Sequence, residues 1–230
     1  MNENKRNDIL KLIAVAAMTI DHTGALFFPN QVLFRIIGRI AFPIFAYHIA
    51  LGFKHTSNIK RYLVRLGGFA VLSIVPFYLF SMAIYGNPRY QNVIFTFFFS
   101  LFFLYLIDNK KYLISLTSVV IPLIVLEYLG FTFDYGLYGI GMVLVFYLFS
   151  SPVCQSTLIL ILTLAYQMIR LHINGYNVLY AFTSIQIFSV LAVFLIHSKI
   201  KISIKLPKGF FYVYYPVHMM LLILIYNMMF

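Results

Sequence analysis

Charged residues are scarce in this sequence, and cysteine is almost absent. Asp, Glu, Lys and Arg make up 10% of the 230 residues, whereas 62% are hydrophobic and the mean hydropathy is +0.91. A soluble domain of this length cannot bury so much apolar surface, so the composition excludes one and predicts a polytopic helical membrane protein. Because Cys154 is the only cysteine, a disulfide framework and a cysteine metal motif are also excluded.

Acidic residues are few as well, six against 17 basic ones, which gives a net charge of +11. In a soluble protein this charge would suggest a nucleic-acid partner. Here the bases fall between apolar segments, where membrane orientation and anionic lipid explain them. We therefore expect membrane lipids as partners and no nucleic acid. Spacings typical of His and carboxylate metal ligands are also missing, so we expect no metal.

Long apolar segments dominate what is present. They predict an all-α integral membrane protein, a single bundle of about nine transmembrane helices that forms one domain over residues 1–230. The first run lacks a cleavage site typical of a signal peptide, so we take it as the first span. Pro76 and the Gly67–Gly68 pair are expected to bend the third of these helices. The nine segments run from about Ile9 to Phe28, Leu33 to Phe53, Tyr62 to Tyr85, Val93 to Ile107, Tyr112 to Leu129, 136 to 150, Thr157 to Leu171, Val178 to Ile196 and Phe210 to Phe230.

The distribution of bases predicts the orientation in the membrane. With a cytoplasmic N-terminus, thirteen of the 17 basic residues lie at inner ends and loops. Only Arg89 and Arg170 fall in outer loops, and Arg35 and Arg39 lie inside the second span. This asymmetry favours a cytoplasmic N-terminus in a multi-pass protein of the cell membrane.

The first two spans carry the polar residues that need most explanation. A charge at membrane depth costs about 2.5–3.5 kcal/mol on insertion scales, so it is retained where it is paired or used. Asp21 and His22 lie about two turns below the outer end of the first span, and Arg35 and Arg39 enter the second span from the same side. A short turn makes the two helices antiparallel neighbours, so these residues meet at one depth. The simplest arrangement pairs Asp21 with Arg39 and leaves His22 facing a cavity; a buried structural ion pair with a core histidine is the alternative.

Lys11 and His22 share one side of the first helix. Two side chains eleven positions apart on a helix point within about 20° of the same direction and differ in height by about 16 Å. One cation near the inner surface and one acid–base group deep in the membrane therefore face the same way, a spacing that suits a long, thin acyl carrier.

Other candidates are more open to a structural explanation. Lys11, Lys54 and Arg61 could hold the phosphates of a nucleotide-bearing carrier, or they could simply follow the positive-inside rule. Glu127 could dock an amine or accept its proton, or be an ordinary interface carboxylate. His218 lies near Tyr215 about two turns into the last span, where Pro216 loosens the helix, and could line a cavity or pack structurally.

Six motifs follow one another along the chain: Lys11 to Gly24, Arg35 to Ala46, Gly52 to Asn58, Asn92 to Thr96, Asp134 to Gly139 and Tyr214 to His218. In this order they resemble the TraX family of membrane proteins, whose founding member is an acetylase of conjugative pilin. This family is similar to wider transmembrane acyltransferases, in which an arginine ten residues before a histidine marks the first span. Lys11, eleven residues before His22, holds the place of that arginine at nearly the same spacing, which keeps a charge but loses the bidentate fork.

The resemblance implies transfer of an acetyl group from cytoplasmic acetyl-CoA to a peptide amine or a hydroxyl, for example of a glycan. His22 would then be the general base or a transient acetyl carrier, with Asp21 and Arg39 holding the site. Arg35 or Arg39 would steady the oxyanion. Two other interpretations stay open: a small-solute transporter with a buried proton relay, and a non-catalytic membrane partner.

Overall fold

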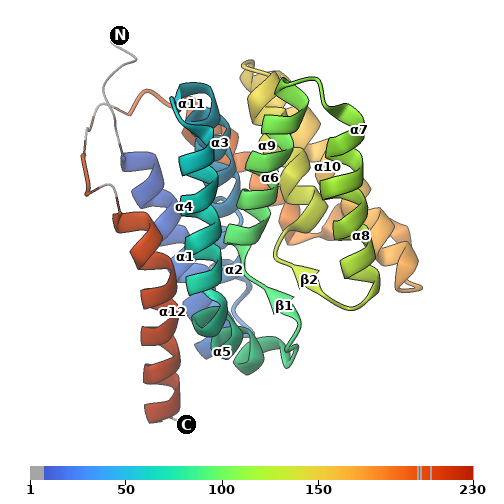
Figure 1. Cartoon of the computed structure of the whole chain (residues 1–230). Helices are drawn as coiled ribbons and strands as arrows, with labels where there is room; N and C mark the ends of the chain where they lie inside the picture. Colours follow the sequence, from blue (N-terminus) through green and yellow to red (C-terminus); the bar gives the residue numbers. More distant parts are fainter. Residues whose placement is uncertain (1–7, 201, 203, 208, 230) are drawn as a thin grey trace. The chain divides into compact units, whose positions relative to one another are not determined.

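Long helices make up most of the structure, a computed structural model that describes residues 8–200, 202, 204–207 and 209–229 (Figure 1). The contacts divide the chain into two units, which we describe separately. The first comprises Met1–Phe45 and Ser151–His218, and the second comprises Ala46–Ser150 and Met219–Phe230. The expectation of one domain stays a prediction.

Four helical stretches of the described residues are long and apolar enough to cross a membrane, and a fifth is possible if a bent pair counts as one span. The chain is therefore a multi-pass membrane protein. The nine-span count and the orientation stay predictions, because the remaining predicted spans form shorter apolar helices. The long stretches are α1 (Ile9–Phe27), α2 (Val32–Gly38) with α3 (Ala41–His55), α10 (Pro152–Ile173) and α12 (Phe210–Met229). The bent pair is α4 (Ile59–Leu72) with α5 (Ile74–Tyr85). The shorter helices are α6 (Val93–Asp108), α7 (Tyr112–Ser115) with η1 (Leu116–Val120) and α8 (Ile121–Tyr128), α9 (Gly136–Leu148), and η3 (Ile185–Val190) with α11 (Leu191–His197).

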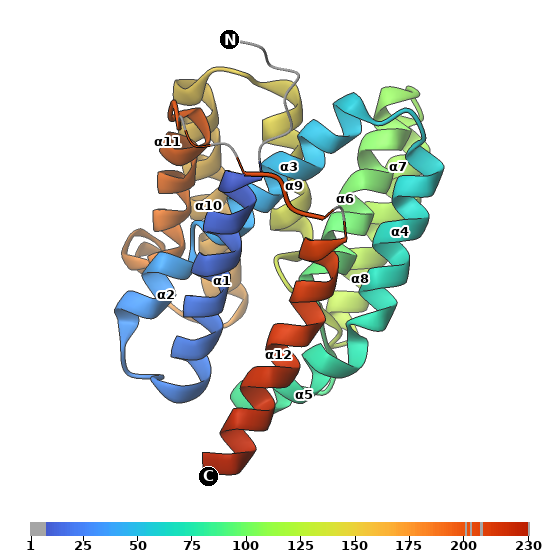
Figure 2. The same ribbon diagram turned by 90° about the vertical axis from the view of Figure 1, so that its left-hand side faces the viewer.

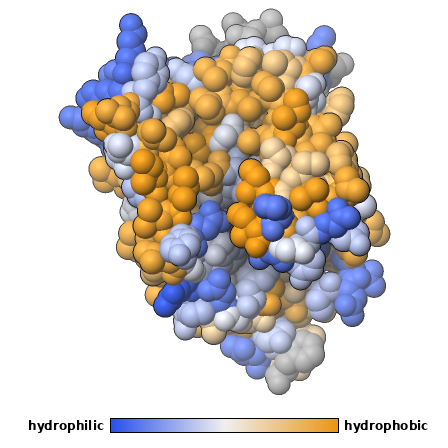
Figure 3. All heavy atoms as spheres, turned by 90° about the vertical axis from the view of Figure 1, so that its right-hand side faces the viewer, coloured by the Kyte–Doolittle hydropathy of each residue, from blue (hydrophilic) through white to orange (hydrophobic). Residues whose placement is uncertain are grey.

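The surface agrees with a lipid environment. Large apolar side chains are exposed on helices of both units, for example Ile124 at 51% on α8 and Ile161 at 56% on α10. Figure 3 shows a broad hydrophobic area on one face of the molecule. Exposed apolar surface of this extent is unusual for a soluble monomer and is expected where side chains contact lipid tails.

In the first unit, α1 and α2 lie side by side as an antiparallel pair, as the short turn between them predicts (Figure 2). Gly24 of α1 permits the close approach, because a Cβ there would overlap the side chain of Phe34. The break between α2 and α3 falls at Arg39 and Ile40. Pro43 explains its position, since proline cannot donate to the carbonyl of Arg39, four residues earlier, and its ring crowds that carbonyl.

The predicted span from Val178 to Ile196 is not one regular helix. It consists of two 3₁₀ segments, η2 (Val178–Thr183) and η3, followed by α11. The segments are separated at Ser184, whose side chain accepts a hydrogen bond from the backbone N–H of Gln186. A serine that satisfies a nearby backbone donor in this way competes with continuation of the helix. The break matters for the site, because it positions the Gln186 side chain.

The second unit contains the bent pair and a small sheet. The bend of 48° between α4 and α5 occurs at Ser73, three residues before Pro76, so the predicted bend at this proline is confirmed. At Gly67–Gly68 the helix is not interrupted, since α4 continues through both residues, and the bend expected there stays a prediction. Glycine lowers helix propensity, but packing along the helix overrides that preference.

Two short parallel strands, β1 (Tyr90–Gln91) and β2 (Thr132–Phe133), were not predicted from sequence. The Tyr90 hydroxyl donates to Oδ1 of Asp134 at 2.9 Å, and the Thr96 hydroxyl donates to the Asp134 carbonyl at 2.5 Å. Burial, followed by the charge of Asp134, raises the pKa of Tyr90 well above its usual value. These contacts hold the strands against α6 and give Asp134 a structural role within this unit.

Candidate active site

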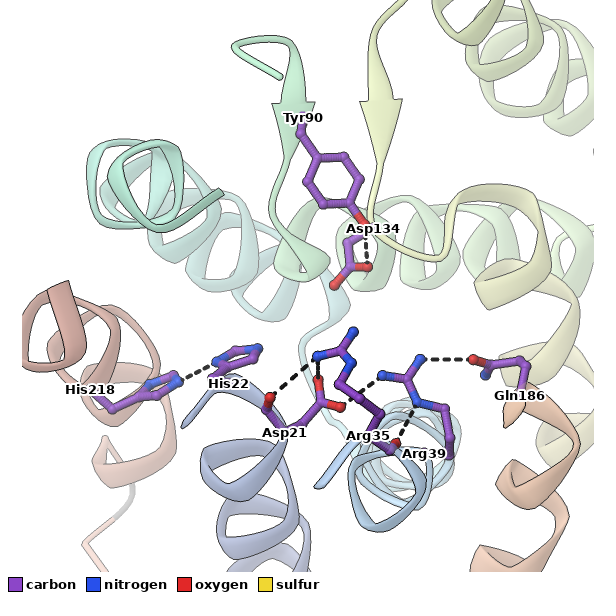
Figure 4. Close-up of polar contacts among 8 residues, drawn as sticks. All are labelled: Asp21, His22, Arg35, Arg39, Tyr90, Asp134, Gln186 and His218. Carbon is purple, nitrogen blue, oxygen red and sulfur yellow. Dashed lines mark hydrogen bonds and ion pairs between the residues drawn. The ribbon is translucent and has the colours of Figure 1, made fainter. Parts of the chain in front are cut away.

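Asp21 lies between two arginines (Figure 4). Its Oδ2 accepts from Nη1 of Arg35 at 2.8 Å, and its Oδ1 accepts from Nη2 of Arg39 at 2.8 Å. Nη1 of Arg35 also donates to the Asp21 backbone carbonyl at 3.2 Å. The predicted Asp21–Arg39 pair is therefore confirmed, and Arg35 joins it. Each carboxylate oxygen receives one charge-assisted hydrogen bond, the strong class of such interactions.

The cluster is buried but not electrically neutral. The Asp21 and Arg39 side chains are 11% and 12% exposed, whereas that of Arg35 is 25% exposed. One carboxylate against two guanidinium groups leaves one positive charge, because arginine does not deprotonate in proteins. The excess charge, with Arg35 as its most exposed member, suits contact with an anion or a developing oxyanion.

Gly38 brings α2 close enough to α1 for both arginines to reach Asp21. A Cβ at this position would overlap Oδ1, Cβ and Cγ of Asp21. Only glycine therefore allows the backbone of α2 to contact the carboxylate side chain.

Gly38→Ala is expected to destabilise the protein by about 1–3 kcal/mol, because the added methyl must push α2 away from α1. For a chain of this size that corresponds to a fall in Tm of roughly 2–12 °C, measurable as thermal unfolding in detergent. Gly68→Ala is the matched control, since nothing lies within 4 Å of a Cβ there. An unchanged Tm in Gly38→Ala would contradict the close approach.

Arg39 is fixed by two further contacts. Its Nη1 donates to Oε1 of Gln186 at 2.9 Å, and its Nε donates to the Arg35 carbonyl at 3.0 Å. Sequence reasoning missed Gln186, although an amide inside the apolar segment 178–196 was a usable signal. The contact joins η3 to α2 and leaves Arg39 committed to structural partners.

The sequence predicts a His22 side chain that faces a cavity without a protein partner. In the structure, His22 contacts a second histidine. Nδ1 of His22 lies 2.8 Å from Nε2 of His218, with the two rings nearly parallel at 8°. Tyr215 is buried and contacts the His218 ring edge-on at 5.8 Å between centroids. Of the two candidates in the last predicted span, His218 contacts His22 and Tyr215 contacts His218, and their contact with a substrate stays a prediction.

Lys11 lies near the N-terminal end of α1, where its ammonium group pairs with Oδ1 of Asp8 at 3.1 Å and lies 5.4 Å from the Phe211 ring centroid. Asp8 directly precedes α1, but its side chain makes no capping bond to the helix. Instead, its Oδ2 accepts from the backbone N–H of Leu206 at 3.0 Å. Lys11 thus forms a partly buried ion pair with Asp8, the residue that joins the start of α1 to the segment before α12.

The remaining candidates belong to the second unit. Lys54 and Arg61 are exposed, and the Lys54 ammonium group lies 5.3 Å from the Tyr147 ring centroid. Glu127 is exposed near the end of α8. The contacts described for these three residues assign none of them to the Asp21 cluster, so their roles in binding carrier or acceptor stay predictions. Groups of three His, Cys, Asp or Glu side chains suited to a metal do not occur among the described residues.

The fold and the cluster define a multi-pass membrane protein with a carboxylate, two arginines and a histidine pair on neighbouring helices. The chain belongs to the family described as TraX protein, whose family model matches residues 6–226. The resemblance inferred from the motifs is thereby confirmed. No solved structure matches the chain.

Three relatives give the family context. The chain is 49% identical over 53 residues to an uncharacterized protein of Rickettsia prowazekii, a match that covers 22% of this chain. It is 36% identical over 78 residues, 32% of the chain, to a probable fimbrial assembly protein, FimC of serogroup H1, of Dichelobacter nodosus. It is 31% identical over 94 residues, 40% of the chain, to Protein TraX of Escherichia coli. The matched segments span only 21%, 32% and 36% of these relatives' own lengths.

Proposed function

We propose that this protein is a membrane-embedded acetyltransferase. It moves an acetyl group from cytoplasmic acetyl-CoA to an amine, such as a peptide N-terminus, or to a hydroxyl at the membrane or cell surface. The observation that carries the proposal is the position of His22, an acid–base side chain that directly follows the arginine-bound Asp21 on α1. Membership of the TraX family supports the reaction class.

The reaction requires few functional groups. The lone pair of the acceptor nitrogen attacks the thioester carbonyl, and His22 takes a proton from that nitrogen. The resulting tetrahedral intermediate carries a negative oxygen. Its collapse breaks the carbon–sulfur bond and expels the thiolate, which receives the proton from His22. The products are the acetylated amine and free coenzyme A thiol, and the histidine returns to its starting state.

Arg35 is the better of the two arginines for stabilising the oxyanion. Arg39 donates to Asp21, to the Arg35 carbonyl and to Gln186. Within the part of the chain that the structure describes, Arg35 donates through Nη1 alone, to Asp21. The Arg35 group therefore has donors left for an oxyanion, and it is the more exposed of the two.

A peptide amine is the acceptor that we propose first. One relative is named as a probable fimbrial assembly protein, which supports an acceptor among the subunits of surface appendages. A hydroxyl fits the same chemistry, since His22 would take its proton in the same way. Lys11, Lys54 and Arg61 are proposed to contact the carrier phosphates, and Glu127 to contact the acceptor.

The test uses the purified full chain in lipid vesicles with labelled acetyl-CoA and a short peptide that has a free N-terminus. We expect peptide-dependent release of coenzyme A thiol, equal in amount to the label transferred. Empty vesicles and an N-terminally blocked peptide are the controls. Uptake of a solute without thioester cleavage would overturn the proposal in favour of a transporter, and neither activity would favour a non-catalytic partner.

A further inference from the structure

We propose that His218 is a positioning residue that fixes the tautomer of His22, so that Nε2 of His22 is the atom that accepts the proton. The inference rests on the proposed acetyl transfer for its catalytic meaning. Its structural part, the tautomer itself, follows from a chain of three groups on α1 and α12.

The backbone carbonyl of Tyr214 determines the direction of the hydrogen bonds. Nδ1 of His218 lies 2.9 Å from this oxygen, and a carbonyl only accepts, so Nδ1 must carry the hydrogen. In a neutral imidazole the other nitrogen then accepts. Nε2 of His218 therefore accepts from Nδ1 of His22, 2.8 Å away. With its hydrogen on Nδ1, neutral His22 has its basic lone pair on Nε2.

Packing holds the His218 ring in the orientation that these hydrogen bonds require. The residue is 4% exposed, and its ring stacks on that of Tyr214 at 5.2 Å between centroids and an angle of 11°. One turn away, the hydroxyl groups of Thr19 and Tyr214 lie 2.8 Å apart. Thr19 and His22 are three residues apart on α1, and Tyr214 and His218 are four residues apart on α12. Two side-chain hydrogen bonds on adjoining turns thus hold the helices in one register.

His22 and His218 are arranged like a catalytic base whose orientation is fixed by a further group. When Nε2 of His22 takes the acceptor's proton, its Nδ1–H becomes the donor of a charge-assisted hydrogen bond to His218. His218 thereby stabilises the imidazolium without itself changing protonation. Because His218 is neutral in this role, the resting site carries no additional buried charge beside the arginine cluster.

The tautomer can be observed directly by nitrogen NMR of the wild-type protein with ¹⁵N-labelled histidine. The chain has six histidines, and the His22 signals are identified by their loss in His22→Ala. We expect a protonated-type shift for Nδ1 and an unprotonated-type shift for Nε2. The opposite pattern would overturn the inference, even if no His218 variant folded.

Two substitutions test the catalytic meaning. His218→Phe keeps a ring but offers no acceptor, and we expect kcat to fall about 100-fold or more, with KM for acetyl-CoA unchanged. His218→Gln retains an amide oxygen as acceptor and an N–H donor for Tyr214, and we expect kcat within about tenfold of wild type. If both variants lose equal activity in proportion to lost folded protein, His218 is only structural. The expected tautomer in a protein without acetyl transfer would overturn the proposed function alone.

Discussion

Replacement of His22 by alanine is expected to lower the rate of acetyl transfer by about 10²- to 10⁴-fold, the usual contribution of a positioned general base. The loss should appear in kcat, because the imidazole acts on the acceptor's proton in the transition state and contributes little to binding of the thioester. The measurement is release of coenzyme A thiol by the purified variant in vesicles, with a free-amine peptide as acceptor.

The substitution also removes a contact between α1 and α12, so its structural effect needs a separate measurement. Thr19→Ala is the matched control, since it deletes the neighbouring Thr19–Tyr214 hydrogen bond and leaves the imidazole in place. We expect Thr19→Ala to lose a similar amount of stability, about 1 kcal/mol, and to retain most of its activity. His22→Ala with wild-type kcat would rule out His22 as the base.

A transient acetyl-histidine is the alternative role for His22. In that case a stoichiometric amount of label should remain on the protein when acetyl-CoA is supplied without acceptor. The label should be absent from His22→Ala and should be released when peptide is added. Direct transfer with His22 as base predicts no retained label.

The central pairing is predictable from the sequence because it depends on depth and direction alone. A short turn between apolar segments makes the segments antiparallel, and similar distances from that turn place Asp21 opposite Arg39. The second arginine contact also follows, since Arg35 lies one turn from Arg39 on nearly the same face. The role of Gly38 is visible only in the structure, because it depends on the distance between the two backbones.

Contacts between segments far apart in the sequence cannot be predicted from helical periodicity and turn lengths. Gln186 reaches Arg39 through a break between two 3₁₀ segments, and His218 meets His22 from a helix almost two hundred residues later. Periodicity gives the face of each helix but not which helix packs against that face. The Asp8–Leu206 hydrogen bond also joins segments far apart in the sequence, and it explains why the Asp8 side chain does not cap α1.

Asp21→Ala is expected to destabilise the fold more than any other single change in the cluster. It removes the carboxylate and leaves Arg35 and Arg39 without their common partner in a mostly buried position. Removing one partner of a buried ion pair costs about 3–5 kcal/mol, which corresponds to a fall in Tm of roughly 6–20 °C for a chain of this size. Thermal unfolding in detergent, as for Gly38→Ala, measures this loss.

A triple variant separates scaffolding from function. Replacing Asp21, Arg35 and Arg39 together by leucine removes all three charges, and well-packed apolar side chains can substitute for buried ion pairs with little loss of stability. We expect this variant to recover most of the Tm lost in Asp21→Ala but to remain without acetyl transfer. Recovery of both properties would show that the cluster is only internal structure, because the reaction would then proceed without the charges that we propose to hold His22 and stabilise the oxyanion. Failure of the single variant to lower the Tm would contradict the ion-pair geometry itself, since two buried guanidinium groups cannot lose their shared carboxylate at no cost.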